Sequence, residues 1–169
     1  DITGSSVAQF GLVVLFLAFN LALGIGAYCA KPNRGNRQLV ITYSVWIVLM
    51  IIVIGTVVTN PTFQWNEKDT TTLVLAMVLT VAVFFLGYTW RLPLKDPTVK
   101  GLLAVAYKAV PQLLLAWKFL AEGASGLPAL SLWVGHFSIV VRVGQIYFAA
   151  KEGWDKNLIW LTISEAANE

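Results

Sequence analysis

The chain contains one cysteine and one histidine, and charged residues make up only 12% of its 169 residues. Cys29 alone cannot form an intramolecular disulfide, and a single histidine with a distant cysteine gives no support to a zinc or haem site. A mean hydropathy of +0.72 and a hydrophobic content of 57% exclude an ordinary soluble domain. Composition therefore indicates a polytopic membrane protein without a metal or other cofactor.

Long apolar stretches dominate the chain and predict an all-α fold with about six transmembrane helices in one domain, residues 1–169. Five stretches are long enough to cross a hydrocarbon core of about 30 Å as helices. The sixth is short and has no stop signal, so we expect the native chain to continue. Before Asp1 we expect either a removed leader or a trimmed N-terminus. The expected spans are Val7–Ala30, Leu39–Val58, Thr71–Trp90, Gly101–Ala121, Pro128–Ala149 and a sixth that begins near Trp154.

The distribution of basic residues predicts the orientation. Eight cations fall in connections on one side of the membrane, whereas the other side has Lys68 beside Glu67 and Asp69. This bias places the basic connections in the cytoplasm and the N-terminus outside or in a lumen. A pI near 9.1 then requires no nucleic-acid partner. The eight cations are Lys31, Arg34, Arg37, Arg91, Lys95, Lys100, Lys151 and Lys156.

The first three spans carry few polar residues, so we interpret residues 1–100 as scaffold. Asn20 is expected at most to form a hydrogen bond between helices.

The fourth span differs, because Lys108, Pro111, Gln112 and Lys118 share one side of a helix with 3.6 residues per turn. Pro111 removes one backbone hydrogen bond and can act as a hinge, while Gln112 offers an amide to a ligand. The alternative for Pro111 is a packing kink. Lys118 lies near the external end of this span, where its side chain is expected to extend to the interface, so we assign it a structural role.

The fifth span carries a second polar stripe, and its depth matches that of the first. At 1.5 Å per residue, Arg142 and Lys108 are each roughly 10 Å from the basic side and Glu165 is roughly 15 to 20 Å from it, so we expect the three side chains to meet in one layer. Two cations with one carboxylate favour an anionic or zwitterionic ligand, although a structural ion-pair network remains the alternative. The secondary candidates are His136, Ser138, Gln145 and Asn168.

The segment from Val110 to Gly144 resembles the PQ-loop motif of SWEET-type sugar carriers and cystinosin-like amino-acid exporters. Pro111 and Gln112 match its Pro-Gln pair, and a basic residue, a Gly-and-Ser loop and a second helix with Trp133 and Gly135 follow. The similarity covers residues 101–169 and implies a three-helix unit there. Two features depart from the family: the first half has no Pro-Gln pair, and the predicted direction of the Pro-Gln helix is opposite to that of SWEET proteins.

The sequence thus predicts a carrier of a small polar solute, anionic or zwitterionic, that works by alternating access. The expected binding residues are Lys108, Gln112, Trp133, Arg142 and Glu165, with Pro111 as hinge. The alternative is a noncatalytic receptor or an accessory subunit of a membrane complex that uses the same fold to recognise a ligand or a partner helix. The expected partners are the solute, the lipid bilayer and either a second copy of the chain or a membrane complex. An enzyme is disfavoured because no nucleophile with a base and no metal set is visible.

Overall fold

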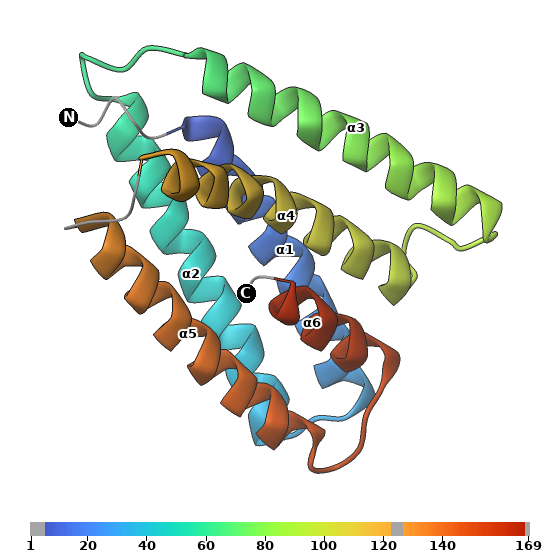
Figure 1. The fold of residues 1–169 in the computed structure, drawn as a ribbon. Coiled ribbons are helices and arrows are strands. Elements are labelled where there is room, and N and C mark those ends of the chain that lie inside the picture. Colours follow the sequence, from blue (N-terminus) through green and yellow to red (C-terminus); the bar gives the residue numbers. More distant parts are fainter. Residues whose placement is uncertain (1–5, 123–126, 168–169) are drawn as a thin grey trace.

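The computed structural model describes the backbone of residues 6–122 and 127–167, and the side chains of residues 6–114 and 136–167. These residues form an all-helical bundle without a strand (Figure 1). The six helices are α1 (Val7–Ala30), α2 (Arg34–Val58), α3 (Glu67–Thr89), α4 (Pro97–Glu122), α5 (Leu127–Ala150) and α6 (Lys156–Ala166).

Within the described part of the chain, three helices are long and apolar enough to cross a membrane: α1, α2 and α3, with 24, 25 and 23 residues. At 1.5 Å per residue each exceeds a hydrocarbon core of about 30 Å. The chain therefore has the features of an integral membrane protein. α6 is much shorter, with 11 residues.

Polar caps extend two of these helices beyond their apolar stretches. The Asn33 side chain accepts a hydrogen bond from the Asn36 amide, so α2 begins five residues before the apolar run at Leu39. Asn66 and Asp69 form a reciprocal capping box, which starts α3 four residues before Thr71. The apolar stretch thus predicts most of the length of each of these helices, whereas the capping residues determine where the helix begins.

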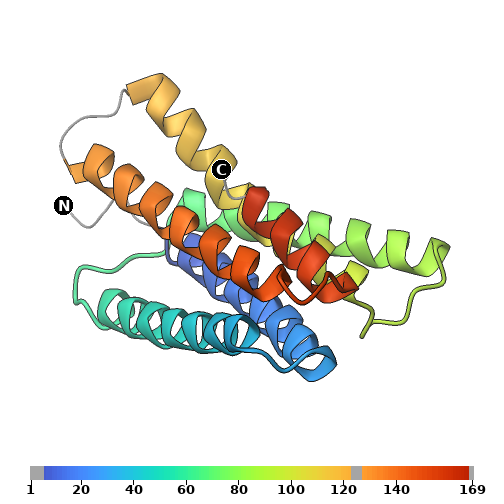
Figure 2. The same cartoon turned by 90° about the horizontal axis from the view of Figure 1, so that it is seen from below.

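α1 lies at the centre of the bundle, in contact with α2, α3, α4 and α6. α2 also packs on α5, and α3 packs on α4, so these two apolar helices flank the centre (Figures 1 and 2). Their outer faces expose large apolar side chains, among them Ile51 of α2 and Val81 of α3. Such faces suit a lipid environment, because lipid chains cover them at no desolvation cost.

Glycines bring helices close together near the basic connections. A Cβ on Gly35 of α2 would lie 2.5 Å from the backbone nitrogen of Ala149 in α5. A Cβ on Gly101 of α4 would lie 2.5 Å from the Trp160 ring of α6. These contacts, possible only without a side chain, hold α5 and α6 against the rest of the bundle.

Candidate functional site

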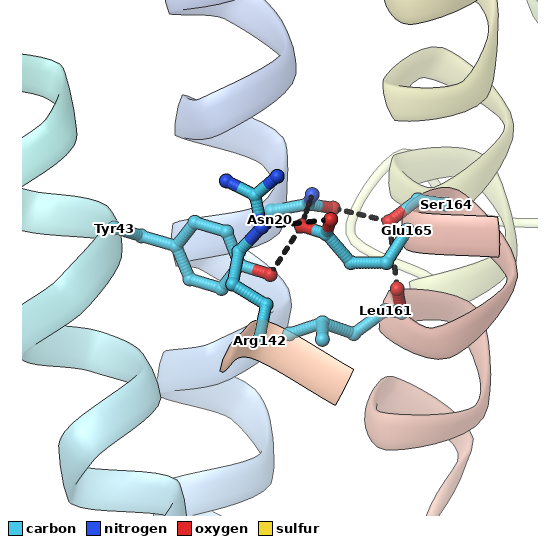
Figure 3. Close-up of polar contacts among 6 residues, drawn as sticks. All are labelled: Asn20, Tyr43, Arg142, Leu161, Ser164 and Glu165. Atoms are coloured by element: carbon cyan, nitrogen blue, oxygen red, sulfur yellow. Dashed lines mark hydrogen bonds and ion pairs between the residues drawn. The ribbon is translucent and has the colours of Figure 1, made fainter. Parts of the chain in front are cut away.

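Glu165 of α6 is fully buried, and side chains from three other helices surround its carboxylate. The Tyr43 hydroxyl of α2 donates to Oε1 at 2.6 Å, and the Asn20 amide of α1 donates to the same oxygen at 3.2 Å (Figure 3). A buried carboxylate requires such partners, because an unpaired charge in an apolar interior is costly. We call Asn20, Tyr43, Arg142, Ser164 and Glu165 the polar cluster.

Arg142 of α5 supplies the opposite charge. Its Nε lies 2.9 Å from Glu165 Oε2, and only 9% of its side chain is exposed. The two atoms are close as an ion pair but are not aligned as a hydrogen bond. Figure 3 shows the two terminal nitrogens of Arg142 pointing away from the carboxylate. Arg142 therefore does not bind Glu165 through the planar pair of N–H groups with which arginine binds carboxylates or phosphates in a bidentate manner.

Ser164 sets the orientation of the Asn20 amide. Its hydroxyl lies 2.6 Å from Asn20 Oδ1 and 2.8 Å from the backbone oxygen of Leu161, and it can donate to either. With Oδ1 accepting from Ser164, the amide nitrogen of Asn20 is directed at Glu165. Two adjacent residues of α6 thus hold both ends of one amide from α1.

Lys108 of α4 adds a second cation to this layer. It is partly buried and close enough for Coulombic interaction with both Arg142 and Glu165. Its Nζ lies 5.5 Å from the centroid of the Phe16 ring, a cation–π contact with α1. The layer therefore holds two cations and one carboxylate, which leaves an excess of positive charge.

The remaining sequence-predicted residues have varied positions. On α5, Gln145 donates to the Thr42 hydroxyl of α2 at 3.1 Å, and His136 and Ser138 are partly buried. On α4, Pro111 is buried within an unbroken helix, and Gln112 is partly buried. The side chain of Trp133 and all of Asn168 lie outside the described residues, as does the Lys118 side chain.

Two members of the polar cluster come from the part of the chain interpreted as scaffold. Asn20 makes the expected interhelical hydrogen bond, but it does so at the carboxylate itself. Tyr43 was missed, because a tyrosine in an apolar stretch looks like an ordinary packing residue. The available signal was that a buried Tyr hydroxyl usually has a partner, and that Glu165 needs donors besides one arginine.

The arrangement offers charge and hydrogen bonds but no group of metal ligands. Among the described residues, no three His, Cys, Asp or Glu side chains lie close enough to hold a metal ion. Comparisons with protein-family models, curated proteins and solved structures found no match to this chain. Function must therefore be argued from the site itself.

Proposed function

We propose that this protein is a carrier for a small polar solute, anionic or zwitterionic, that works by alternating access. The observation behind the proposal is the charged layer where α1, α2, α4, α5 and α6 converge, with two cations and one carboxylate in a membrane protein. Ionisable groups within membrane helices are costly and commonly mark a solute or ion pathway. An excess positive charge favours a solute that carries a carboxylate or phosphate.

Arg142 and Lys108 are the proposed ligands of the solute's anionic group. The terminal nitrogens of Arg142 point away from Glu165 (Figure 3), which supports a role in which one end of the guanidinium is held and the other is presented. Glu165 would then hold Arg142 in one state and contact a cationic group of a zwitterionic solute in another. Gln112 and Trp133 are proposed as further binding residues, and Pro111 as the hinge.

The finer architecture belongs to the same proposal. It comprises six membrane spans, a three-helix PQ-loop-like unit in residues 101–169, cytoplasmic basic connections and an external N-terminus. Orientation can be tested by single cysteines placed at the exposed Lys68 and Lys95 in a Cys29→Ser background. In sealed cells, an impermeant maleimide should label the cysteine at position 68. Labelling at position 95 instead would reverse the orientation.

The transport proposal is tested by counterflow in proteoliposomes with amino acids, small dicarboxylates and neutral sugars as solutes. Lys108→Met keeps the length of the side chain and removes the charge, and we expect at least about a tenfold loss of flux for the preferred anionic solute. The matched control is Lys151→Met, since Lys151 also lies over an aromatic ring, at 4.8 Å from the Phe148 centroid, but outside the layer. Its flux should equal that of the parent.

One outcome would contradict the carrier, and another would contradict its assigned site. Binding of a solute by the purified protein without flux across the vesicle would indicate the receptor or accessory subunit instead. Equal flux in Lys108→Met and the parent would remove Lys108 from the site.

A further inference from the structure

A second feature lies far from the polar cluster, where α3 turns into α4. A cleft of about 320 Å³ opens there, with walls that are almost entirely apolar. Its size falls in the range of small-molecule sites and suits a segment of an acyl chain better than a polar ligand. The residues that form it are Phe84, Gly87, Tyr88, Leu92, Leu94 and Val99.

The surroundings of this cleft have the composition of a membrane interface. Tyr88 and Trp90 are exposed at the end of α3, and Arg91 and Lys95 are exposed in the connection that follows. Tyr and Trp gather at the level of lipid headgroups, and basic residues beside them attract anionic lipids. The apolar walls and the cations are therefore placed at neighbouring depths, as the two parts of a phospholipid are.

Arg91 occupies a backbone position that normally belongs to glycine. α3 ends with the Leu92 amide donating to the Gly87 oxygen at 2.9 Å and the Arg91 amide donating to the Tyr88 oxygen at 3.0 Å. This is a Schellman turn, and Arg91 has the left-handed φ of +53° that it requires. A residue with a Cβ is disfavoured in this conformation, because the Cβ comes too close to the following carbonyl oxygen. The turn places a cation directly before Leu92, which lines the cleft.

The charge balance at the cleft is positive. Asp96 in the same connection is already engaged, since its two carboxylate oxygens lie 2.9 and 3.0 Å from Lys156 Nζ. Arg91 and Lys95 are therefore not neutralised by this carboxylate, and Lys100 adds a third cation one turn into α4.

We propose that this cleft binds one anionic phospholipid, with an acyl chain along Phe84, Leu92 and Val99 and the phosphate held by Arg91 and Lys95. The site is independent of the proposed transport. A role in binding the phosphate would account for an arginine at position 91, where a glycine would adopt the left-handed φ without strain.

The test compares the binding of phosphatidylglycerol and phosphatidylcholine to the purified protein by native mass spectrometry. The parent should retain one phosphatidylglycerol in preference to phosphatidylcholine. Arg91→Gly should reduce the affinity for phosphatidylglycerol about fivefold, since a basic residue near an anionic headgroup contributes about 1 kcal/mol. The same variant should be more thermostable in lipid-free detergent, because glycine is favoured at this φ. An arginine without a role in lipid binding predicts the gain in thermostability alone, and this outcome would overturn the proposal.

Two further variants separate a specific site from diffuse attraction. Arg37→Gln removes an exposed cation beside another cavity near the same end of the bundle, and lipid preference should be unchanged; an equal loss would indicate diffuse attraction only. Gly87→Leu should fill the cleft and weaken both lipids, because a Cβ there already approaches Val99 Cγ2 at 3.4 Å.

If Gly87→Leu does not fold, Leu94→Glu tests the position of the headgroup instead. Leu94 is 71% exposed at the rim, so a carboxylate is tolerated there but repels the headgroup. An unchanged lipid preference in the folded variant would refute the site. Displacement of the lipid by inorganic phosphate at low millimolar concentration would also refute it, because the apolar contacts would then contribute nothing.

Discussion

Among the side chains that the structure describes, two carboxylates are completely buried, and they are held in different ways. Asp69, in the first turn of α3, accepts from the Ser6 hydroxyl at 2.7 Å, the Ala8 amide at 2.9 Å and the Asn66 amide at 3.1 Å. Glu165 accepts from the side chains of Tyr43 and Asn20 and pairs with Arg142. Both carboxylates are thus buried, but the groups that donate hydrogen bonds to them differ in kind.

The difference separates a fixed contact from one that can rearrange. Two of the donors to Asp69 are backbone amides at the starts of α1 and α3, where the helix dipole also favours a negative charge. They cannot leave without unwinding a helix end. The donors to Glu165 are side chains on separate helices, and each can be released by a change of rotamer or a small helix movement. We therefore expect Asp69 to affect stability alone and Glu165 to affect stability and function together.

The largest effect is expected for Glu165→Gln. This change leaves the buried Arg142 without its counter-charge and should lower the free energy of unfolding by about 3–5 kcal/mol. Adding Arg142→Met should recover part of the loss, because the uncompensated cation is removed as well. Denaturant titrations of the single and double variants in mild detergent measure this. A double variant no more stable than Glu165→Gln would show that the pair is not coupled.

The same variant also distinguishes an ion pair from a coupling carboxylate. If Glu165 carries protons during transport, Glu165→Gln should remain folded, lose uptake driven by a pH gradient and retain solute exchange. Unchanged stability, uptake and exchange would contradict both roles.

Asp69→Asn should have a smaller effect, and on stability only. The amide nitrogen of asparagine would face either Ala8 or Asn66, so one buried backbone donor loses its acceptor at a cost of about 1–3 kcal/mol. Flux per folded molecule in proteoliposomes should match the parent. A selective loss of flux at unchanged stability would break the distinction between the two carboxylates.

Tyr43→Phe tests the role of one hydrogen-bond donor to Glu165, the Tyr43 hydroxyl. It removes one of the donors to Glu165 without changing the packed ring, and the free energy of unfolding should fall by about 1 kcal/mol. Tyr107→Phe is the matched control, since the Tyr107 hydroxyl lies 2.9 Å from Thr80 Oγ1 between α3 and α4, away from the cluster. We expect comparable losses of stability but a loss of flux only for Tyr43→Phe. Equal flux in the two variants would exclude Tyr43 from the function.

The sequence predicted the positions of the helices along the chain better than the side-chain contacts between them. The bounds of α1 coincide with the apolar stretch Val7–Ala30, because polar residues stand at both of its ends. The Glu165–Arg142 contact was within reach of the sequence, since depth along two helices places both side chains in one layer. Asn20 and Tyr43 were not, because the rotation of α1 and α2 about their axes depends on packing against α6, which periodicity in one helix does not encode.

The smallest effect concerns a third carboxylate, Asp96, which lies in the connection between α3 and α4 and ties it to the first residue of α6. Burial acts to raise its pKa, but hydrogen bonds from Lys156 and the Thr98 amide outweigh this and hold the pKa below the ordinary value of 3.8. A pKa that is lower in the folded state gives stability that is complete above the ordinary pKa and is lost as the pH falls through the folded value. Because the Lys156 side chain is 52% exposed, screening limits the contribution to less than about 1 kcal/mol. The parent should therefore be slightly more stable than Asp96→Asn at pH 7, and the difference should shrink as the pH falls below 3.8 or when 1 M salt is added, as measured by thermal unfolding. A stability difference that persists in acid would show that Asp96 contributes through packing rather than through its charge. A contribution from charge would then be confined to the buried carboxylates, Asp69 and Glu165.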